Sequence, residues 1–101
     1  MPDLRAIQRE AFSNKVAKGF NTTDVALEFG LLTVEVSEAF TAWYRGEPVG
    51  EELADILIYV AGLAEIVGVD LDAEVKRKLA INQSRVYVPL PNGALVKRSQ
   101  P

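Results

Sequence analysis

The sequence predicts an all-α protein of four helices followed by a short C-terminal arm. Three observations support this fold class. Apolar residues recur at spacings of three and four along most of the chain, as they do on one face of a helix. Capping residues and glycines divide the chain into four such stretches. Near the C-terminus, Pro89 and Pro91 are incompatible with a fifth helix.

The first two helices are delimited by residues that commonly begin and end helices. Asp3 is a suitable N-cap for a helix over about 4–18, and Gly19 follows its last turn. The second helix is expected to begin after the three capping candidates at 21–23 and to continue to about residue 44.

The second helix is amphipathic. One face carries Val25, Phe29, Leu32, Val36, Phe40 and Trp43. The opposite side carries Asp24, Glu28, Glu35, Glu38 and Arg45. This pattern predicts that Phe40 and Trp43 belong to the hydrophobic core.

The third helix is expected over about 51–67, between the breaker at 45–50 and Gly68. It is apolar on several sides, because Ile58 and Ile66 lie outside its main apolar face. Four helices cannot easily surround one of their own, so we expect this helix to pack against a second copy of the chain. The alternative is a compact monomer with a few exposed isoleucines.

The fourth helix is expected to begin after Asp70, its N-cap, and to end at about residue 85. Beyond it, the dipeptide Asn92-Gly93 suggests a turn between two short extended pieces. We therefore divide the chain into a helical domain at 1–88 and an irregular or hairpin arm at 89–101.

Composition excludes several classes of chemistry. The 101 residues include no Cys and no His, which excludes disulfides, thiolate or His-liganded metal sites, and Ser-His triads. The net charge is −3, but residues 1–74 contain all 14 acidic residues, whereas residues 75–101 contain six basic residues and no acid. The N-terminus resembles no targeting segment, and the longest apolar run is too short to span a bilayer. We expect a cytoplasmic protein that binds no membrane.

Two acidic pairs suggest a metal site. Glu35 and Glu38 are three residues apart on the second helix, and Glu52 and Asp55 have the same spacing on the third. Asp55 lies in an otherwise apolar stretch, where a buried, unpaired carboxylate would be unfavourable. Two facing helices that each carry such a pair could bind a hard divalent cation such as Mg²⁺. Exposed acidic pairs without a metal are the alternative.

Other residues near these pairs could contact a substrate. Tyr59 lies one turn beyond Asp55, either facing a ligand or packed in the core. Lys78, Asn82 and Arg85 share one face of the fourth helix, and donors of these types suit a polyphosphate. Taken alone, these residues are more simply interpreted as a solvated basic helix end.

The segments EFGLLTVEVSEAF and EELADILIYVAGLAEIVGVDLDAEVKRKLAINQSRVY resemble the MazG-like all-α nucleoside triphosphate pyrophosphohydrolases, and SNKVAKGF resembles the segment before the first family motif. The resemblance implies a four-helix, bundle-like subunit that assembles as a homodimer or homotetramer. It also implies Mg²⁺-dependent hydrolysis of (deoxy)nucleoside triphosphates to monophosphate and pyrophosphate in nucleotide-pool house-cleaning, with Mn²⁺ as a substitute metal and no nucleic-acid polymer as a partner.

The resemblance also assigns residues. The metal ligands would be Glu35, Glu38, Glu52 and Asp55, and the phosphate contacts Lys78, Asn82, Arg85 and Lys18. Tyr59 would lie near the nucleoside, and either Glu35 or Glu38 would be the general base. Two alternatives remain open, namely a related enzyme of the phosphoribosyl-ATP type and a non-catalytic helical dimerisation module.

Overall fold

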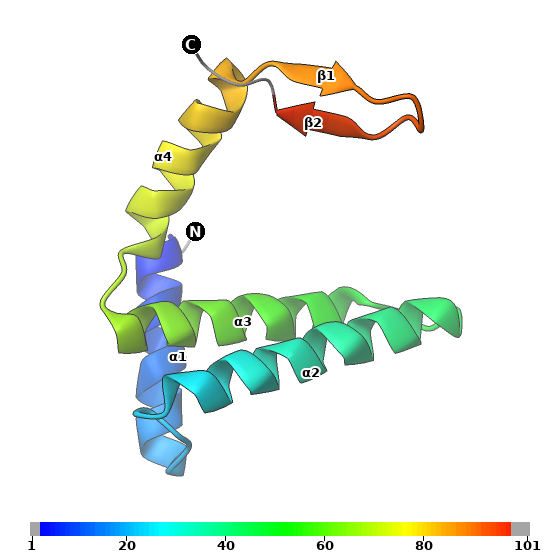
Figure 1. The fold of residues 1–101 in the computed structure, drawn as a ribbon. Helices are drawn as coiled ribbons and strands as arrows, with labels where there is room; N and C mark the ends of the chain where they lie inside the picture. Colours follow the sequence, from blue (N-terminus) through cyan, green and yellow to red (C-terminus); the bar gives the residue numbers. More distant parts are fainter. Residues whose placement is uncertain (1–2, 98–101) are drawn as a thin grey trace.

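The computed structural model describes residues 3–97, which form four helices and one β-hairpin (Figure 1). The helices are α1 (Leu4–Lys18), α2 (Val25–Tyr44), α3 (Gly50–Val67) and α4 (Leu71–Ser84). The strands are β1 (Tyr87–Pro89) and β2 (Leu95–Lys97). The predicted all-α class and four helices are confirmed, with ends within a residue or two of those expected. The last residues of the predicted arm, 98–101, lie outside the described part of the chain.

Local capping explains most helix boundaries. Asp3 accepts a hydrogen bond from Ala6 N at 2.7 Å, and Asp70 accepts one from Ala73 N at 3.1 Å, as the sequence predicted. Gly19 and Gly68 end α1 and α3 with φ angles of 71° and 75°, a conformation that costs glycine little.

The predicted cap of α2 at residues 21–23 is wrong. The N-cap is Asp24, whose carboxylate accepts a hydrogen bond from Leu27 N at 3.0 Å. Asn21 instead organises the preceding loop, where its side-chain oxygen accepts a hydrogen bond from Asp24 N at 3.0 Å. Because the side chain of Asn21 is hydrogen-bonded within the loop, Asp24 caps the helix instead.

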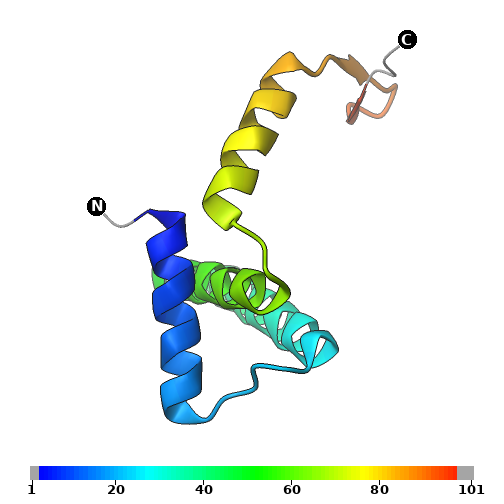
Figure 2. The same ribbon diagram turned by 90° about the vertical axis from the view of Figure 1, so that its left-hand side faces the viewer.

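Helix α3 is the centre of the fold, because both α1 and α2 pack against it. α2 and α3 lie side by side and antiparallel. α1 crosses this pair at the end opposite the α2–α3 loop (Figures 1 and 2). α4 packs on α1 and leads away from the α2–α3 pair, with the hairpin at its far end. Within residues 3–97, no helix is both long and apolar enough to cross a bilayer.

The buried core of one chain is small and rich in alanine. Its apolar members are Ala39, Ala42, Ala61, Leu63 and Ala64. Phe40 and Trp43, which the sequence placed in the core, are instead 62% and 65% exposed. The buried residues of α2 next to them are Ala39 and Ala42, so the alanines rather than the large rings occupy the α2 side of the core.

The C-terminal segment forms the expected hairpin. β1 pairs with β2 in antiparallel register, with Val88 opposite Val96. Gly93 has a φ of 88° in the connecting turn, consistent with the predicted Asn92-Gly93 turn. The first strand begins at Tyr87, slightly before the arm boundary drawn from the sequence.

A buried glutamine connects α1 to the start of α4. Gln8 is 1% exposed, and its amide nitrogen donates to Val69 O at 2.7 Å and to Glu65 Oε2 at 3.1 Å. Its side-chain oxygen accepts a hydrogen bond from Leu71 N at 2.6 Å. These three bonds fix the α3–α4 loop and hence the direction in which α4 leaves the other helices.

Candidate metal centre

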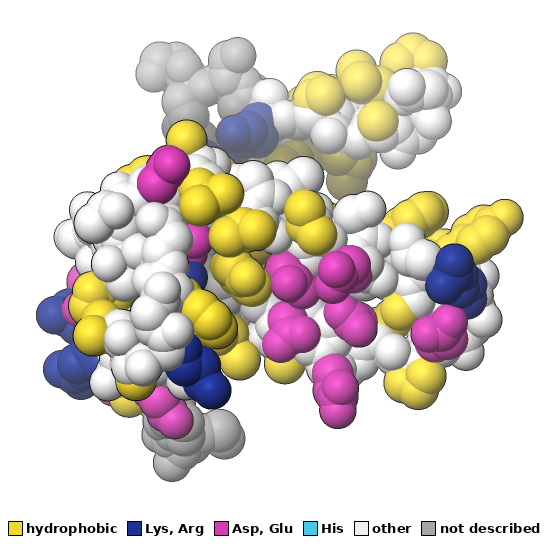
Figure 3. Space-filling model, turned by 90° about the horizontal axis from the view of Figure 1, so that it is seen from below, with side chains coloured by type: hydrophobic (Ala, Val, Ile, Leu, Met, Phe, Trp, Pro, Cys, Tyr) yellow, Lys and Arg dark blue, Asp and Glu magenta, His cyan; other side chains and the backbone are white. Residues whose placement is uncertain are grey.

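Three carboxylates from two helices converge between α2 and α3. Glu35 on α2 and Glu52 and Asp55 on α3 each place one carboxylate oxygen within 4.8 Å of the other two. α2 and α3 run antiparallel side by side (Figure 1), and this packing brings Glu35 next to Glu52 and Asp55. Acidic side chains gather on one face of the molecule in Figure 3.

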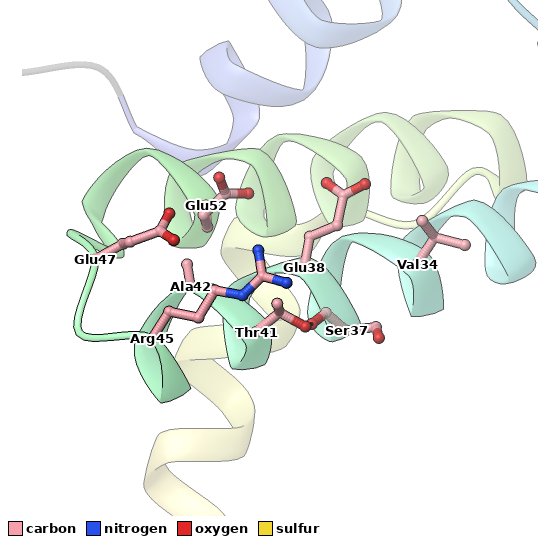
Figure 4. Close-up of a pocket in the computed structure, with 8 residues that line it drawn as sticks. All are labelled: Val34, Ser37, Glu38, Thr41, Ala42, Arg45, Glu47 and Glu52. Carbon is pink, nitrogen blue, oxygen red and sulfur yellow. Dashed lines mark hydrogen bonds between the residues drawn. The ribbon is translucent and has the colours of Figure 1, made fainter.

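Glu38 lies at the border of this group. It lines a pocket of about 340 Å³ together with Glu52 (Figure 4). The remaining lining residues are Val34, Ser37, Thr41, Ala42, Arg45 and Glu47. The structure therefore brings the four predicted carboxylates into one region, with Glu38 facing the adjoining pocket.

The electrostatics of the centre favour the binding of a cation. Partial burial raises the pKa of Glu35, and the neighbouring carboxylates of Glu38 and Asp55 raise it further. Like charges at this separation destabilise the ionised cluster, and a divalent cation would remove that repulsion. Carboxylate oxygens from two rigid helices are also the donor type that Mg²⁺ and Mn²⁺ accept, so the residues present fit such an ion.

Tyr59 lies on the α1 side of the carboxylates. Partial burial raises the pKa of its hydroxyl, and the negative charges of Glu35 and Glu28 raise this pKa further. The Lys15 ammonium lies 5.1 Å from the centre of its ring, a cation–π distance. Tyr59 is thus held between the carboxylates and a buried charged pair.

That pair was not predicted from the sequence. Lys15 on α1 and Glu28 on α2 are 8% and 1% exposed and form an ion pair. Asn21 Nδ2 donates a second hydrogen bond to Glu28, at 3.2 Å. A Cβ at position 62 would lie only 2.9 Å from Lys15 Cε, so Gly62 leaves the space through which the lysine reaches Glu28. The pair links α1, α2 and α3 at one point beside the candidate metal centre.

The predicted phosphate contacts do not join the carboxylates within one chain. Lys78, Asn82 and Arg85 belong to α4 or its C-cap, and α4 packs on α1. Arg85 Nη1 donates to Asn82 Oδ1 at 3.0 Å, which keeps these two side chains together. Lys18 is exposed in the last turn of α1. In contrast, Arg45 lines the carboxylate pocket, although its position in the sequence indicates only that it belongs to the polar side of its helix.

The chain is similar to known proteins in both sequence and structure. No family model matches the chain. A dATP/dGTP diphosphohydrolase of Cyanophage S-2L is 36% identical over 64 residues, which is 63% of this chain. The chain spans 59% of the length of this curated relative.

The structural comparison covers nearly all of the chain. A Cyanophage S-2L MazG-like pyrophosphohydrolase, solved with dGDP and three catalytic Mn²⁺ ions per active site, superposes with a TM-score of 0.77. The match covers 98% of this chain and 100% of that chain, at 24% sequence identity. The sequence motifs, the sequence relative and the superposition agree, and we conclude that this chain has the MazG-like all-α fold and that its resemblance to the MazG-like pyrophosphohydrolases is confirmed.

Proposed function

We propose that this chain is a pyrophosphohydrolase that converts (deoxy)nucleoside triphosphates to monophosphates and pyrophosphate with the help of Mg²⁺. The convergence of Glu35, Glu52 and Asp55 oxygens within 4.8 Å is the observation that carries this proposal. Support comes from the relatives, one a dATP/dGTP diphosphohydrolase and the other solved with dGDP and Mn²⁺. We propose the same nucleotide class as the substrate here.

The proposed metal ligands are the predicted four, Glu35, Glu38, Glu52 and Asp55. A bound divalent cation, Mg²⁺ or Mn²⁺, would offset phosphate charge and lower the pKa of a bound water. The chain itself supplies a carboxylate, Glu35 or Glu38, that accepts a proton from the attacking water. The water oxygen forms a bond to the α-phosphorus as the bond to the α–β bridging oxygen breaks, and pyrophosphate leaves.

Substrate binding is proposed to involve Tyr59 beside the nucleoside, and Lys78, Asn82, Arg85 and Lys18 at the phosphates. Because α4 leads away from α2 and α3, its residues could reach a carboxylate centre only in a second copy of the chain. We therefore propose a homodimer or homotetramer that forms through the apolar face of α3. The positive charges of Lys78 and Arg85, which are opposite in sign to the carboxylates, support this arrangement.

Exposed apolar residues also support self-association. On α3, Leu53 is 56% exposed, and Leu57 and Ile58 are also exposed. On α2, Phe40, Trp43 and Tyr44 are also exposed, and the ring centre of Phe40 lies 6.1 Å from that of Trp43 and 6.2 Å from that of Tyr44. Exposed apolar patches of this kind are more often interfaces with another protein than surfaces in contact with water.

We propose in addition that the protein is cytoplasmic and has a house-cleaning role in the nucleotide pool.

The test is analysis of the products formed from a panel of NTPs and dNTPs, and separately from phosphoribosyl-ATP, in the presence of Mg²⁺. We expect pyrophosphate rather than orthophosphate from the preferred nucleotide. In ¹⁸O-labelled water the label should enter the monophosphate, because water attacks the α-phosphorus. Asp55→Asn should lose activity while retaining its helical circular dichroism, since it removes a charged ligand and keeps the side-chain shape.

Other results would contradict parts of the proposal. Orthophosphate as the product would indicate a different hydrolase, and preference for phosphoribosyl-ATP would favour the related enzyme. A non-catalytic module would show no turnover, and a non-hydrolysable triphosphate with Mg²⁺ would not raise its melting temperature.

A further inference from the structure

Arg45 differs from the other basic residues in its position relative to the carboxylates. Among residues 3–97 it is the one Lys or Arg that lines the 340 Å³ pocket with Glu38 and Glu52. In Figure 4 its guanidinium extends into the space between these two glutamates. The chain therefore supplies one cation of its own at the edge of the carboxylate centre.

A tight turn at the C-terminal end of α2 holds the backbone of Arg45 in this position. Arg45 is the C-cap of α2, and its backbone N–H donates to Thr41 O at 3.1 Å. Gly46 follows with a φ of 73°, a left-handed conformation that few other residues adopt readily. The N–H of Glu47 then donates to Ala42 O at 2.9 Å, which closes the turn. The backbone of Arg45 is thus anchored on both sides.

The guanidinium has donor capacity to spare. Although Glu38, Glu47 and Glu52 line the same pocket, Arg45 makes no ion pair within 4.0 Å among the described residues 3–97. A favourable contact with the helix C-terminus would account for its charge but not for its direction into the pocket. Five N–H donors in a planar fork match the geometry of a phosphate group.

The order of residues along the α2–α3 pair indicates which phosphates Arg45 could reach. The ring centre of Tyr59 lies 5.1 Å from the ammonium of Lys15 on α1, so Tyr59 lies towards the α1 end of the pair. Arg45 lies at the other end, beside the α2–α3 loop, seven residues and about 10 Å along α2 from Glu38. The carboxylates lie between them. A nucleotide with its sugar near Tyr59 and its α-phosphate at the carboxylates would extend its distal phosphates towards Arg45.

We propose that Arg45 binds the β- and γ-phosphates of the triphosphate and remains bound to the pyrophosphate as it leaves. This inference rests on the proposed function, because it needs a triphosphate at the carboxylate centre. When the α–β bridging P–O bond breaks, negative charge develops on the pyrophosphate oxygens. Two N–H donors of one guanidinium would stabilise that charge in the transition state.

The test compares Arg45→Gln and Arg45→Lys with the wild-type enzyme in the presence of Mg²⁺. For Arg45→Gln we expect kcat/KM for the preferred triphosphate to fall, and the inhibition constant for pyrophosphate to rise, by about tenfold to one hundredfold, as for the loss of a charge-assisted hydrogen bond. Inhibition by the nucleoside monophosphate should change less than about twofold. Arg45→Lys should give intermediate values, because lysine keeps the charge but not the fork.

Arg9→Gln is the matched control. Arg9 is exposed on α1 and lines none of the described pockets, and its substitution changes the net charge by the same amount. It should leave both constants unchanged. If Arg45→Gln fails to fold, as judged by circular dichroism, the intermediate values of Arg45→Lys decide the question.

Two results would overturn the proposal. Unchanged pyrophosphate inhibition in Arg45→Gln would remove Arg45 from the site, and equal weakening of monophosphate inhibition would show that it does not act on the distal phosphates. Failure of the wild-type protein to release pyrophosphate would refute the proposed function instead, so the two failures are distinguishable.

Discussion

Charged side chains near the α2–α3 interface are arranged in two different ways. Lys15 and Glu28 are buried and neutralise each other, whereas Glu35, Glu52 and Asp55 face one another with like charge. The first arrangement contributes to the packing of three helices. The cluster of three carboxylates is unfavourable in the absence of a cation. Such an arrangement is typical of a binding site that the surrounding fold holds in place.

The buried pair gives a prediction about stability. Lys15→Met should lower the free energy of unfolding by about 3–5 kcal/mol, because it leaves the Glu28 carboxylate buried without its partner. Urea denaturation followed by circular dichroism measures this change. The double variant Lys15→Met/Glu28→Leu should recover much of the loss, since no unpaired charge remains. If the double variant is as unstable as the sum of both single variants, the two side chains are not coupled.

At the scale of the elements, the first turn of α4 is connected to α1 by charged and polar contacts. Arg5 Nη1 lies 2.9 Å from Asp70 Oδ2, next to the hydrogen bonds made by Gln8. Asp70 therefore serves both as N-cap and as ion-pair partner. The direction of α4 depends on these contacts more than on apolar packing, because none of its residues is fully buried.

This arrangement predicts a pH dependence. The hydrogen bond from Ala73 N lowers the pKa of Asp70 below its ordinary value of 3.8, and the charge of Arg5 lowers it further. A lowered folded-state pKa means that the carboxylate stabilises the fold at pH values above 3.8 and that this contribution is lost as the pH falls through the folded pKa. Asp70→Asn should therefore be less stable than wild type at neutral pH.

The measurement is urea denaturation of both proteins between neutral pH and about pH 2. The difference in free energy of unfolding should shrink as the pH falls into the acid range. A difference that is constant over the whole range would mean that Asp70 acts by shape rather than by charge.

At the scale of the whole molecule, one chain is too extended to bury its apolar residues. The radius of gyration is 16.8 Å, whereas about 13 Å is expected for a compact domain of this length. Apart from Leu63, the buried apolar residues among the described ones are alanines, while Phe40, Trp43 and Leu53 are mostly exposed. A second copy of the chain would bury part of this exposed apolar surface, which is the reason for the proposed oligomer.

We expect the protein to have a solution mass of two or four times 11.1 kDa. Leu53→Glu should shift it towards the monomer, because it places a charge on the apolar face of α3. Size-exclusion chromatography with light scattering measures the mass. Ser13→Glu, at an exposed position on α1, is the matched control and should not change it. A monomeric wild-type protein at micromolar concentration would contradict the prediction.

Much of this architecture follows from the sequence alone, because helix formation and capping depend on neighbouring residues. Asp3, Gly19 and Asp70 mark helix ends correctly, and the three-residue spacing places each acidic pair on one helix face. The sequence does not distinguish Asp24 from Asn21 as the cap of α2, because both side chains have the same capping chemistry and only the loop conformation determines which of them caps the helix.

Which helix faces meet depends on packing between elements. Periodicity identifies an apolar face but not its partner, so it predicts Phe40 and Trp43 in the core, whereas α2 contributes Ala39 and Ala42 to it. The Lys15–Glu28 pair and the position of Arg45 in the carboxylate pocket have no local signature either. Such contacts depend on the direction in which each loop sends the next helix, and that direction is set by packing between residues far apart in the chain.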